Sequence, residues 1–431
     1  MSDELIVRNG RIFTPEGWVS GRELVCRDGR IAAIRPVSAG AVLHLHAAPA
    51  SAAVPRIVDA EGGDIVPGFI DLHIHGAGGS DFMDATPYAV DVITAHHAAG
   101  GTTAMLATTA GQPFHRILEA AHNVAACRKE GRGACELLGL HIEGPYFSLS
   151  KKGCHVPEAL HPPRESEWRQ LLDLGDVFKH ITVAPELPGA LELIEACAAA
   201  GVRVAAGHSE ATYPQTMAAV ERGLSHVTHL YSVMATIVKN GPHRIAGLLE
   251  ATLLEDRLTT EIIADNYHVN PELARLAYKC KSLHQLALIT DAMRGMGMPD
   301  GEYTFGGFDG TLAVVENGVA VDRERKGFAS STCTMADCVR NCCTKQGQSY
   351  EDALLRASLV PAQIAQVAGR KGRLAAGWDA DVVVLGPEHR VETTISRGRV
   401  CYQRTAPPAI LKESVERACV ELPRLQRPAR V

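Results

Sequence analysis

Residues 65–75 read Ile-Val-Pro-Gly-Phe-Ile-Asp-Leu-His-Ile-His and decide the fold. Their apolar side chains are nearly continuous, which is typical of a strand buried on both faces of a parallel sheet. Because side chains alternate along a strand, His73 and His75 at its end point the same way and can chelate one divalent cation. The Gly-Ala-Gly-Gly that follows at 76–79 leaves room for a ligand. The segment therefore predicts a buried strand that brings two imidazoles to one point.

Seven more apolar strands follow along the chain, and Ala- and Leu-rich helical segments separate most of them. Strands that alternate with helices in this way form a parallel sheet. Eight β/α units across roughly 300 residues are typical of a TIM-like (β/α)8 barrel, whose working residues lie where the strands end. A doubly wound sheet is the alternative, but no G-x-G-x-x-G motif follows the first strand. The further strands are expected at residues 102–108, 136–144, 181–185, 202–208, 226–230, 260–264 and 285–290, and the helices at 87–99, 114–128, 190–200, 213–222 and 271–281.

The two ends of the chain have a different texture, of short strands broken by turns such as Asn9-Gly10 and Asp28-Gly29. We expect residues 1–62 and 369–431 to build one small β-sandwich domain, with a terminal helix at the far end, and residues 63–368 to form the barrel. Its strands are expected at 5–7, 11–13, 23–26, 31–34, 381–385, 391–396 and 399–402. Hairpins over the barrel mouth are expected at 303–305, 311–315 and 319–322, helices at 350–358, 361–369 and 411–419, and a solvent loop without function at 41–53, which includes His44 and His46.

Composition excludes several classes of protein. The 431 residues include 43 Lys and Arg against 49 Asp and Glu, a formal net charge of −6. A nucleic-acid binder would carry a basic patch or stripe. No apolar run approaches the roughly 18 residues of a membrane span, and the N-terminus lacks the pattern of a secretory signal. We therefore expect a cytoplasmic protein with neither nucleic-acid nor membrane partners.

The twelve cysteines include no C-x-x-C pair, so neither a zinc ribbon nor a redox dithiol is indicated. Their densest cluster fits no common metal template and is interpreted as buried, reduced thiols around a helix. It consists of Cys333, Cys338, Cys342 and Cys343.

Polar side chains accumulate where the predicted strands end. A single buried His or Asp is more often a satisfied core group than a ligand, but six of the eight strand ends carry His, Asp or Glu. Mixed imidazole and carboxylate ligands suit zinc, iron or a neighbouring transition metal. A metal-bound water has a pKa of about 7, and a nearby carboxylate can pass its proton to a leaving amine. The pattern therefore predicts hydrolysis of an amide or ester. The residues concerned are His73, His75, Glu143, His208, His229, Asp265, His268 and Asp291.

Together these segments resemble the amidohydrolase superfamily and, within it, the N-acetylglucosamine-6-phosphate deacetylases. The similarity covers essentially the whole chain, including both β-rich ends. It implies a metal-dependent deacetylase that acts on an N-acetylhexosamine phosphate, converting N-acetylglucosamine 6-phosphate to glucosamine 6-phosphate and acetate. The segments that carry it are 66–76, 81–84, 141–145, 151–155, 207–209, 228–231, Asp265 with His268, and 290–292.

The resemblance also implies individual roles. His73 and His75 are similar to ligands of a first metal, beside Asp291 as a further ligand and the general base that later protonates the amine. Some family members lack this His pair and hold one metal, so its presence predicts two ions per subunit, with zinc the first candidate.

Other residues are similar to the second metal's ligands and to groups that contact substrate. Glu143, His208 and His229 correspond to the second metal's ligands, with Glu143 a candidate bridge between the ions. His155 is similar to a histidine that polarises the acetyl carbonyl, and His268 to one that contacts the sugar. Related enzymes are often dimers in which a neighbour completes the phosphate site, which implies a homodimer.

The segment that binds phosphate departs from the family pattern. Where the family has His-Leu-Tyr/Phe-Asn-Ala-Met, residues 229–234 read His-Leu-Tyr-Ser-Val-Met, and Lys-Asn-Gly-Pro-His-Arg at 239–244 replaces an Arg-Glu-Pro-Gly stretch. A lysine would supply a point charge without the bidentate geometry of arginine. The same chemistry on an unphosphorylated or different N-acylated amino sugar or amine is therefore the alternative, and a binding protein on a retired amidohydrolase scaffold is a third hypothesis. The candidate substrate contacts here are Ser232, Val233, Lys239 and Arg244.

Overall fold

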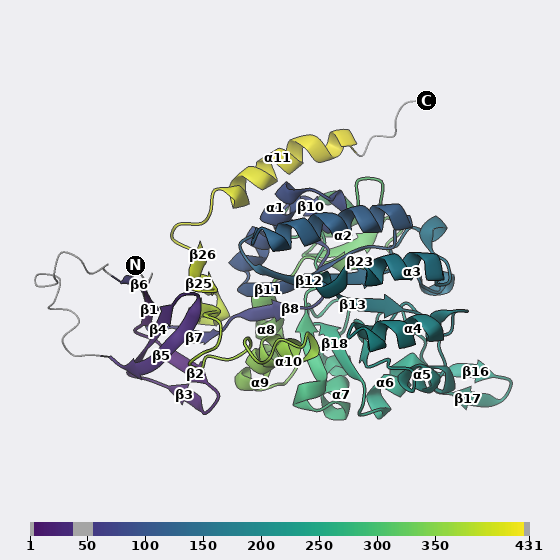
Figure 1. The fold of residues 1–431 in the computed structure, drawn as a ribbon, viewed down its shortest axis with the longest axis horizontal. Helices are drawn as coiled ribbons and strands as arrows, with labels where there is room; N and C mark the ends of the chain where they lie inside the picture. The colour runs from purple at the N-terminus through teal and green to yellow at the C-terminus, as the bar shows by residue number, and fades with distance from the viewer. Residues whose placement is uncertain (1–3, 38–54, 426–431) are drawn as a thin grey trace, which may run out of the picture.

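An eight-stranded parallel sheet forms the centre of the molecule and curls into a barrel (Figure 1). The structure is a computed structural model that describes residues 4–37 and 55–425, so the expected loop with His44 and His46 lies outside the described residues. A parallel bridge between Ile74 and Ala292 joins the continuations of the first and last strands. The predicted barrel is confirmed. In spatial order its strands are β19 (Leu286–Ile289), β18 (Thr259–Ile263), β15 (His226–Val227), β14 (Arg203–Ala206), β13 (Phe178–Val183), β12 (Glu136–Glu143), β11 (Thr102–Thr108) and β8 (Phe69–Asp71).

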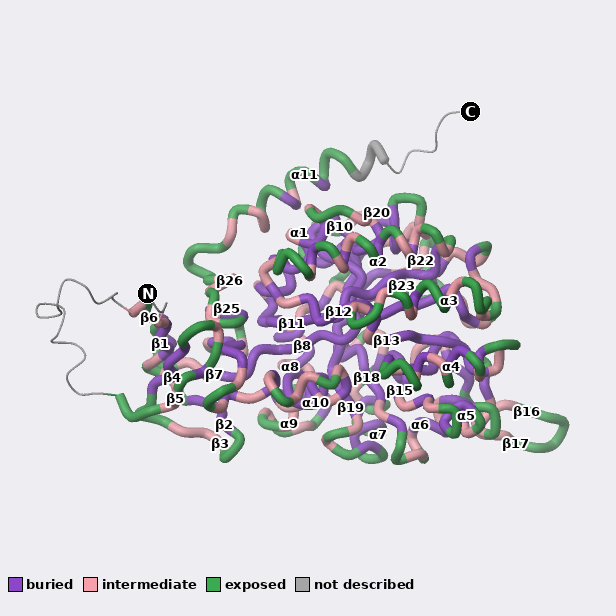
Figure 2. Tube along the Cα trace, viewed as in Figure 1, coloured by how far each residue is buried: buried purple, intermediate pink, exposed green. Residues whose placement is uncertain are grey.

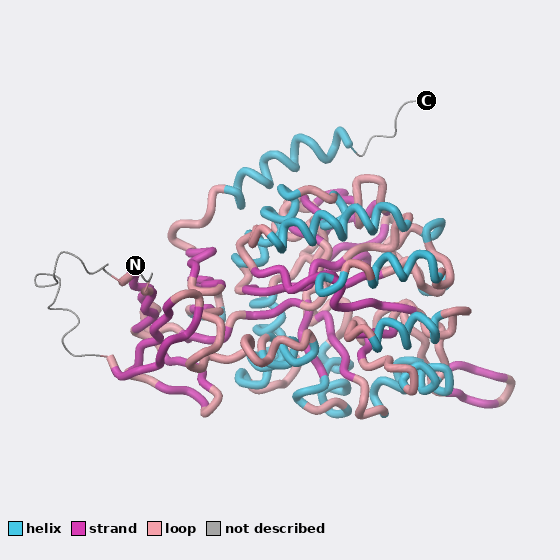
Figure 3. Tube along the Cα trace, in the orientation of Figure 1, coloured by secondary structure: helices cyan, strands magenta, loops and turns pink. Residues whose placement is uncertain are grey.

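Helices cover the outside of the barrel (Figure 3). Several begin at a side-chain cap, as at Thr86, whose hydroxyl accepts the Ala89 N–H at 3.1 Å. Most of the predicted helices are confirmed to within a few residues, although α10 ends five residues earlier and α11 six residues later than expected. Two helices, α3 and α6, were not predicted because they are short, and α8 was expected only as the helix that carries the clustered cysteines. The helices are α1 (Pro87–Ala99), α2 (Phe114–Lys129), α3 (Glu165–Leu172), α4 (Ala190–Ala199), α5 (Tyr213–Val220), α6 (Leu248–Leu254), α7 (Pro271–Cys280), α8 (Met335–Thr344), α9 (Tyr350–Ala357), α10 (Leu359–Ile364) and α11 (Ile410–Leu425).

Two sheets built from both ends of the chain lie beside the barrel (Figure 1). Their facing side chains, among them Ile12, Leu24 and Val382, are fully buried and form a core separate from that of the barrel. One sheet has the order β5 (Arg30–Pro36), β4 (Arg22–Arg27), β1 (Leu5–Arg8), β6 (Arg56–Asp59), and the other has the order β26 (Arg399–Gln403), β25 (Val391–Ser396), β24 (Val382–Leu385), β7 (Asp64–Pro67), β2 (Arg11–Thr14), β3 (Gly17–Val19).

The strand expected at 65–75 is divided between the two parts of the fold, so that prediction was wrong in one respect. β7 pairs with β2 and β24 in the six-stranded sheet, and β8 pairs with β11 in the barrel. The chain crosses at Gly68, where an added Cβ would lie 2.2 Å from the Thr103 hydroxyl. Continuous apolar character hid this break, because both sheets bury these residues completely, and the Pro67-Gly68 pair was its one local signal.

An antiparallel sheet covers the mouth of the barrel, as expected from its hairpins. Its last strand was not predicted, and a parallel bridge from Ser331 to Ala292 ties it to the end of the barrel. A separate hairpin extends away from the barrel, and Figure 2 shows it as exposed. The mouth sheet consists of β20 (Gly301–Phe305), β21 (Thr311–Glu316), β22 (Val319–Asp322) and β23 (Phe328–Ser331), the exposed hairpin of β16 (Val238–Asn240) and β17 (His243–Ile245), and a short pair beside the first strand of β9 (Gly76–Ala77) and β10 (Ser80–Asp81).

The clustered cysteines lie on or beside α8, and all are free thiols. Cys333, Cys338 and Cys342 are buried and Cys343 is half-buried, which confirms their interpretation as core thiols. Within the described parts of the chain, every helix is too short or too polar to cross a bilayer.

Candidate metal centre

Two groups of three buried side chains meet where the barrel strands end. Within each group the candidate ligand atoms all lie within 4.8 Å of one another. The carboxyl ends of parallel strands share one edge of a barrel, which is why residues far apart in sequence converge there. The first group is His73, His75 and Asp291, and the second is Glu143, His208 and His229.

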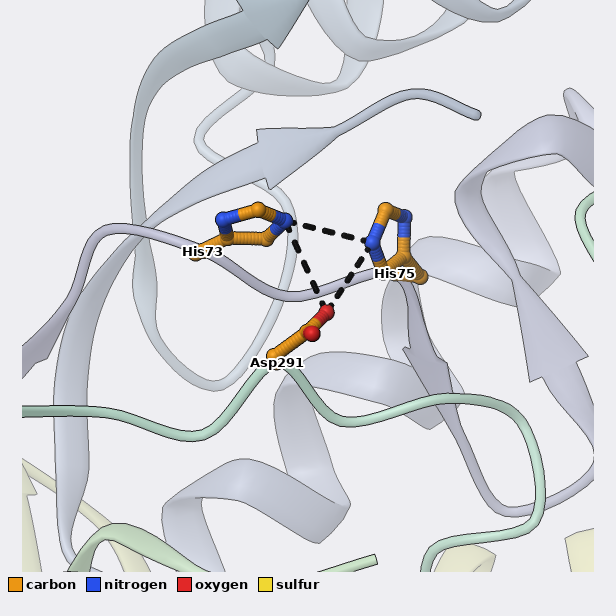
Figure 4. A group of neighbouring side chains, drawn as sticks. All are labelled: His73, His75 and Asp291. Carbon is orange, nitrogen blue, oxygen red and sulfur yellow. Dashed lines mark hydrogen bonds and ion pairs between the residues drawn. The ribbon is translucent and has the colours of Figure 1, made fainter. Parts of the chain in front are cut away.

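The first group joins the end of the first strand to the end of the last (Figure 4). His73 Nε2 lies 3.3 Å from His75 Nε2, as expected for side chains that point the same way. Asp291 Oδ1 lies 3.2 Å from His75 Nε2 and 3.5 Å from His73 Nε2. The three polar atoms therefore face one point from three directions.

The second group is centred on Glu143, the last residue of β12. Its Oε1 lies 3.2 Å from His229 Nε2 and 3.3 Å from His208 Nε2. The same carboxylate also reaches the first group, since Oε1 lies 3.3 Å from His73 Nε2 and Oε2 lies 3.3 Å from His75 Nε2. Glu143 thus lies between the two groups, as a bridging ligand would.

Left-handed backbone at three of these residues turns their side chains into the barrel mouth. His208, His229 and Asp291 have φ angles of 50°, 27° and 49°, a region that non-glycine residues seldom adopt and that clusters at functional sites. Asp291 is held on both sides, because its N–H donates to His73 O at 2.9 Å and its carbonyl accepts the Ser331 N–H at 3.0 Å. The Ser330 hydroxyl donates to the same carbonyl.

Hydrogen bonds on the far side of two imidazoles orient their Nε2 atoms toward the centre. His73 Nδ1 lies 2.9 Å from Glu261 Oε1, and His208 Nδ1 lies 2.8 Å from the Lys151 carbonyl. Since a carboxylate and a carbonyl only accept, each Nδ1 is the donor and each Nε2 keeps a free lone pair. This is the arrangement that a metal-bound histidine requires.

The electrostatics of the centre favour a positive charge. Burial would lower the pKa of His75, but hydrogen bonds to Asp291 and Glu143 outweigh it and raise that pKa to about 9. Burial would also lower the pKa of His73, but the charges of the same two carboxylates outweigh it and raise that pKa. The field that would hold a proton here also attracts a cation, and the imidazole and carboxylate set fits zinc or another transition metal.

His155 lies beside the centre, whereas the contacts of His268 are with Asp265 and Phe328; both rings have a defined orientation. The Gly111 N–H donates to His155 Nδ1 at 2.7 Å, so the His155 proton is on Nε2, which lies 3.5 Å from Glu143 Oε2. Burial lowers the pKa of His155 well below its ordinary value, so the ring is neutral. His268 Nδ1 lies 2.7 Å from Asp265 Oδ2, and the ring packs on Phe328.

The remaining candidate substrate contacts fall into two sets. Ser232 and Val233 are half-buried in the turn after His229, and the Val233 carbonyl accepts the Ser209 N–H at 3.3 Å. Lys239 and Arg244 face each other across the exposed β16–β17 hairpin, which extends away from the barrel (Figure 1). The fold therefore does not bring these two cations to the six candidate ligands of the same chain.

A sequence model of the Amidohydrolase family matches residues 65–401. This chain belongs to that family. The amidohydrolase is 34% identical over 397 residues to N-acetylgalactosamine-6-phosphate deacetylase of Escherichia coli O157:H7, covering 92% of this chain and 98% of that protein. It is 34% identical over 346 residues to N-acetylglucosamine-6-phosphate deacetylase of Vibrio furnissii, covering 80% and 84%.

Solved structures agree with this family assignment. N-acetylglucosamine-6-phosphate deacetylase from Pasteurella multocida superimposes with a TM-score of 0.82 at 28% identity, covering 92% of the amidohydrolase and 99% of that chain. The Mycobacterium smegmatis enzyme of the same name gives a TM-score of 0.79 at 32% identity, covering 92% and 99%. The barrel with its β domain is therefore the fold of this family.

Two residues of the amidohydrolase's centre were missed by the reasoning from sequence. Gly111 orients His155 through its backbone N–H, which leaves no signal in a side chain. Glu261 is fully buried and orients His73. Its one signal is a carboxylate inside the otherwise uncharged strand Thr-Thr-Glu-Ile-Ile at 259–263, which burial without a partner would strongly disfavour.

Proposed function

We propose that this amidohydrolase is a metal-dependent deacetylase that converts N-acetylglucosamine 6-phosphate to glucosamine 6-phosphate and acetate. The observation that carries the proposal is the convergence of four imidazoles and two carboxylates in one buried centre. Curated relatives at 34% identity bear the names N-acetylgalactosamine-6-phosphate and N-acetylglucosamine-6-phosphate deacetylase, which supports this class of substrate.

The centre would hold two divalent ions, with zinc the first candidate. His73, His75 and Asp291 would hold one ion, Glu143, His208 and His229 the other, and the Glu143 carboxylate lies within reach of both. When bound, such ions polarise the acetyl carbonyl and lower the pKa of water toward 7.

The chain's own residues would move the protons. The Asp291 carboxylate lies in the first group, 3.2 Å from His75 Nε2, where it can accept the proton of the attacking water. Asp291 then returns that proton to the sugar nitrogen as the carbon–nitrogen bond breaks. His155, with its proton on Nε2, donates a hydrogen bond to the acetyl oxygen as negative charge develops there.

The positions of the predicted phosphate contacts support a second candidate substrate beside the sugar phosphate. Ser232 and Val233 lie close to the metal ligands, whereas Lys239 and Arg244 are on an exposed hairpin. That exposure favours a homodimer in which this hairpin serves a neighbouring subunit's site. It also motivates the alternative, the same chemistry on an unphosphorylated N-acyl amino sugar. A cytoplasmic location stays a prediction from the sequence.

A paired assay tests the proposal. Acetate release would be measured from N-acetylglucosamine 6-phosphate, N-acetylgalactosamine 6-phosphate and N-acetylglucosamine, with metal content determined on the same sample. We expect a strong preference for a phosphorylated sugar and bound transition metal. Equal turnover of the unphosphorylated sugar would favour the alternative, and a chain without metal or turnover after reconstitution would support the retired-scaffold hypothesis.

A further inference from the structure

Glu261 lies beneath the candidate metal centre and contacts both halves of it. It is fully buried on β18, with Oε1 at 2.9 Å from His73 Nδ1 and at 3.4 Å from the His229 N–H. The first contact is a strong hydrogen bond and the second is long and weak. β19 pairs with β18, and the Ile74–Ala292 bridge joins its continuation to that of β8, so the bond from Glu261 to His73 crosses the interior of the closed barrel.

A second histidine holds this carboxylate in place. His226 on β15 directs its Nε2 to Glu261 Oε2 at 3.2 Å, and its own ring packs on His180. Both carboxylate oxygens are therefore occupied, and the side chain has one orientation. A carboxylate held in this way can fix the tautomer and the angle of the imidazole that it accepts from.

The first group of ligands has no other such support at a ring nitrogen. His75 Nδ1 is buried and has no hydrogen-bond partner among the described residues. In the second group the Lys151 carbonyl, not Glu261, orients His208, and His229 Nδ1 is likewise buried without a hydrogen-bond partner among the described residues. The first position therefore depends on Glu261 more than the second position does.

The negative charge of Glu261 also favours a cation at the first metal position. Glu143 and Asp291 are the only carboxylates among the six candidate ligands, and together they do not neutralise two divalent ions. Glu261 brings a third negative charge to within one imidazole of the first ion, where the low-dielectric interior strengthens its effect.

We propose that Glu261 is a positioning residue that loads the first metal position, held by His73, His75 and Asp291, through its hydrogen bond to His73 Nδ1. The inference rests on the proposed function, because it requires a metal at that position. Glu261 itself would contact neither metal nor substrate. The proposal predicts that the affinity of the first ion depends on Glu261 and that the affinity of the second ion does not.

The test measures zinc binding to the purified full-length chain by equilibrium dialysis over a buffered range of free zinc, with ion content determined by mass spectrometry. Glu261→Met removes the acceptor at nearly constant volume, and it is expected to weaken the first ion about 10- to 100-fold while the second keeps its affinity. In a His208→Asn background, which damages the other position, the same change should remove the remaining tight ion.

Two further variants separate positioning from a general effect on the fold. Glu261→Gln keeps an oxygen for His73 Nδ1 but loses the charge, and it should show a smaller loss confined to the same ion. Thr252→Val removes a buried hydroxyl that donates to the Leu248 carbonyl at 2.7 Å within α6, outside the barrel. That control should keep both ions at wild-type affinity even if its thermal midpoint falls.

The outcomes are distinguishable. A wild-type chain that binds no ion would reject the proposed function together with this inference. A wild-type chain with two ions, and a folded Glu261→Met chain that binds both with unchanged affinity or loses both equally, would reject the role of Glu261 alone. If Glu261→Met does not fold, the Glu261→Gln chain decides, and unchanged affinity for the first ion there also overturns the proposal.

Discussion

Replacing Asp291 by asparagine tests its role as general base. Asparagine has the same shape and keeps an oxygen at the position of Oδ1, 3.2 Å from His75 Nε2. The bonds that hold residue 291 run through its backbone, to His73 and Ser331, and are unaffected by the change. The substitution therefore removes the negative charge and the capacity to accept a proton, while the amide oxygen can still reach the first metal position, so metal content is measured alongside turnover.

The expected loss follows from that restricted change. General-base catalysis contributes about 10²- to 10⁴-fold, which corresponds to about 3–5 kcal/mol of transition-state stabilisation. Turnover of Asp291→Asn should fall by that factor with KM nearly unchanged, because the substrate is bound by other groups. Asp265→Asn is the matched control, since its carboxylate orients His268 at 2.7 Å and its loss should act mainly on KM.

The assay is acetate release under saturating substrate, with metal content measured on each preparation. Asp291→Asn protein that retains its metal and turns over within about threefold of wild type would refute the assignment of Asp291 as the base. The same result would require a different proton acceptor near the centre, of which Glu143 is the other carboxylate in contact with the imidazoles.

Three further outcomes are expected. Removal of metal by a chelator should abolish turnover and lower the thermal midpoint of unfolding. The reason is that an ion at 100 times its Kd stabilises the folded state by about 2.7 kcal/mol. A thermal midpoint that added zinc does not restore would contradict this. Burial would raise the pKa of Glu136, but Arg370 and Lys371 outweigh it and lower that pKa to about 2. The ionised carboxylate therefore stabilises the folded state by an amount on the order of 3 kcal/mol above about pH 4.5, and this stabilisation is lost as the pH falls toward 2. Acid unfolding of Glu136→Gln should therefore be less steep in that window, and identical acid titrations would argue against the pair. Gly68→Ala should destabilise the chain by about 1–3 kcal/mol in denaturant unfolding, because the new Cβ would lie 2.2 Å from the Thr103 hydroxyl; an unchanged midpoint would show that this crossing can relax.

Much of the barrel was readable from local pattern. Apolar strands alternate with helices along the chain, and that periodicity is a property of neighbouring residues. The strand that carries His73 and His75 could be read in the same way, but its division at Gly68 was missed, because two different sheets bury the two halves equally and the apolar pattern continues through the Pro67-Gly68 turn signal. Short helices such as α6 were missed because seven residues carry little periodic signal.

The sequence by itself determined the fold class and which side chains stand at strand ends, since parallel strands deliver their carboxyl ends to one edge whatever their order. Tertiary structure alone decided how those side chains are grouped, how Glu143 lies between the groups, and where the Lys239 hairpin points. It also decided that Glu261 orients His73 across 188 positions of sequence. The physical reason is that hydrogen-bond partners and ligand angles depend on closure of the barrel, which no local window of residues contains.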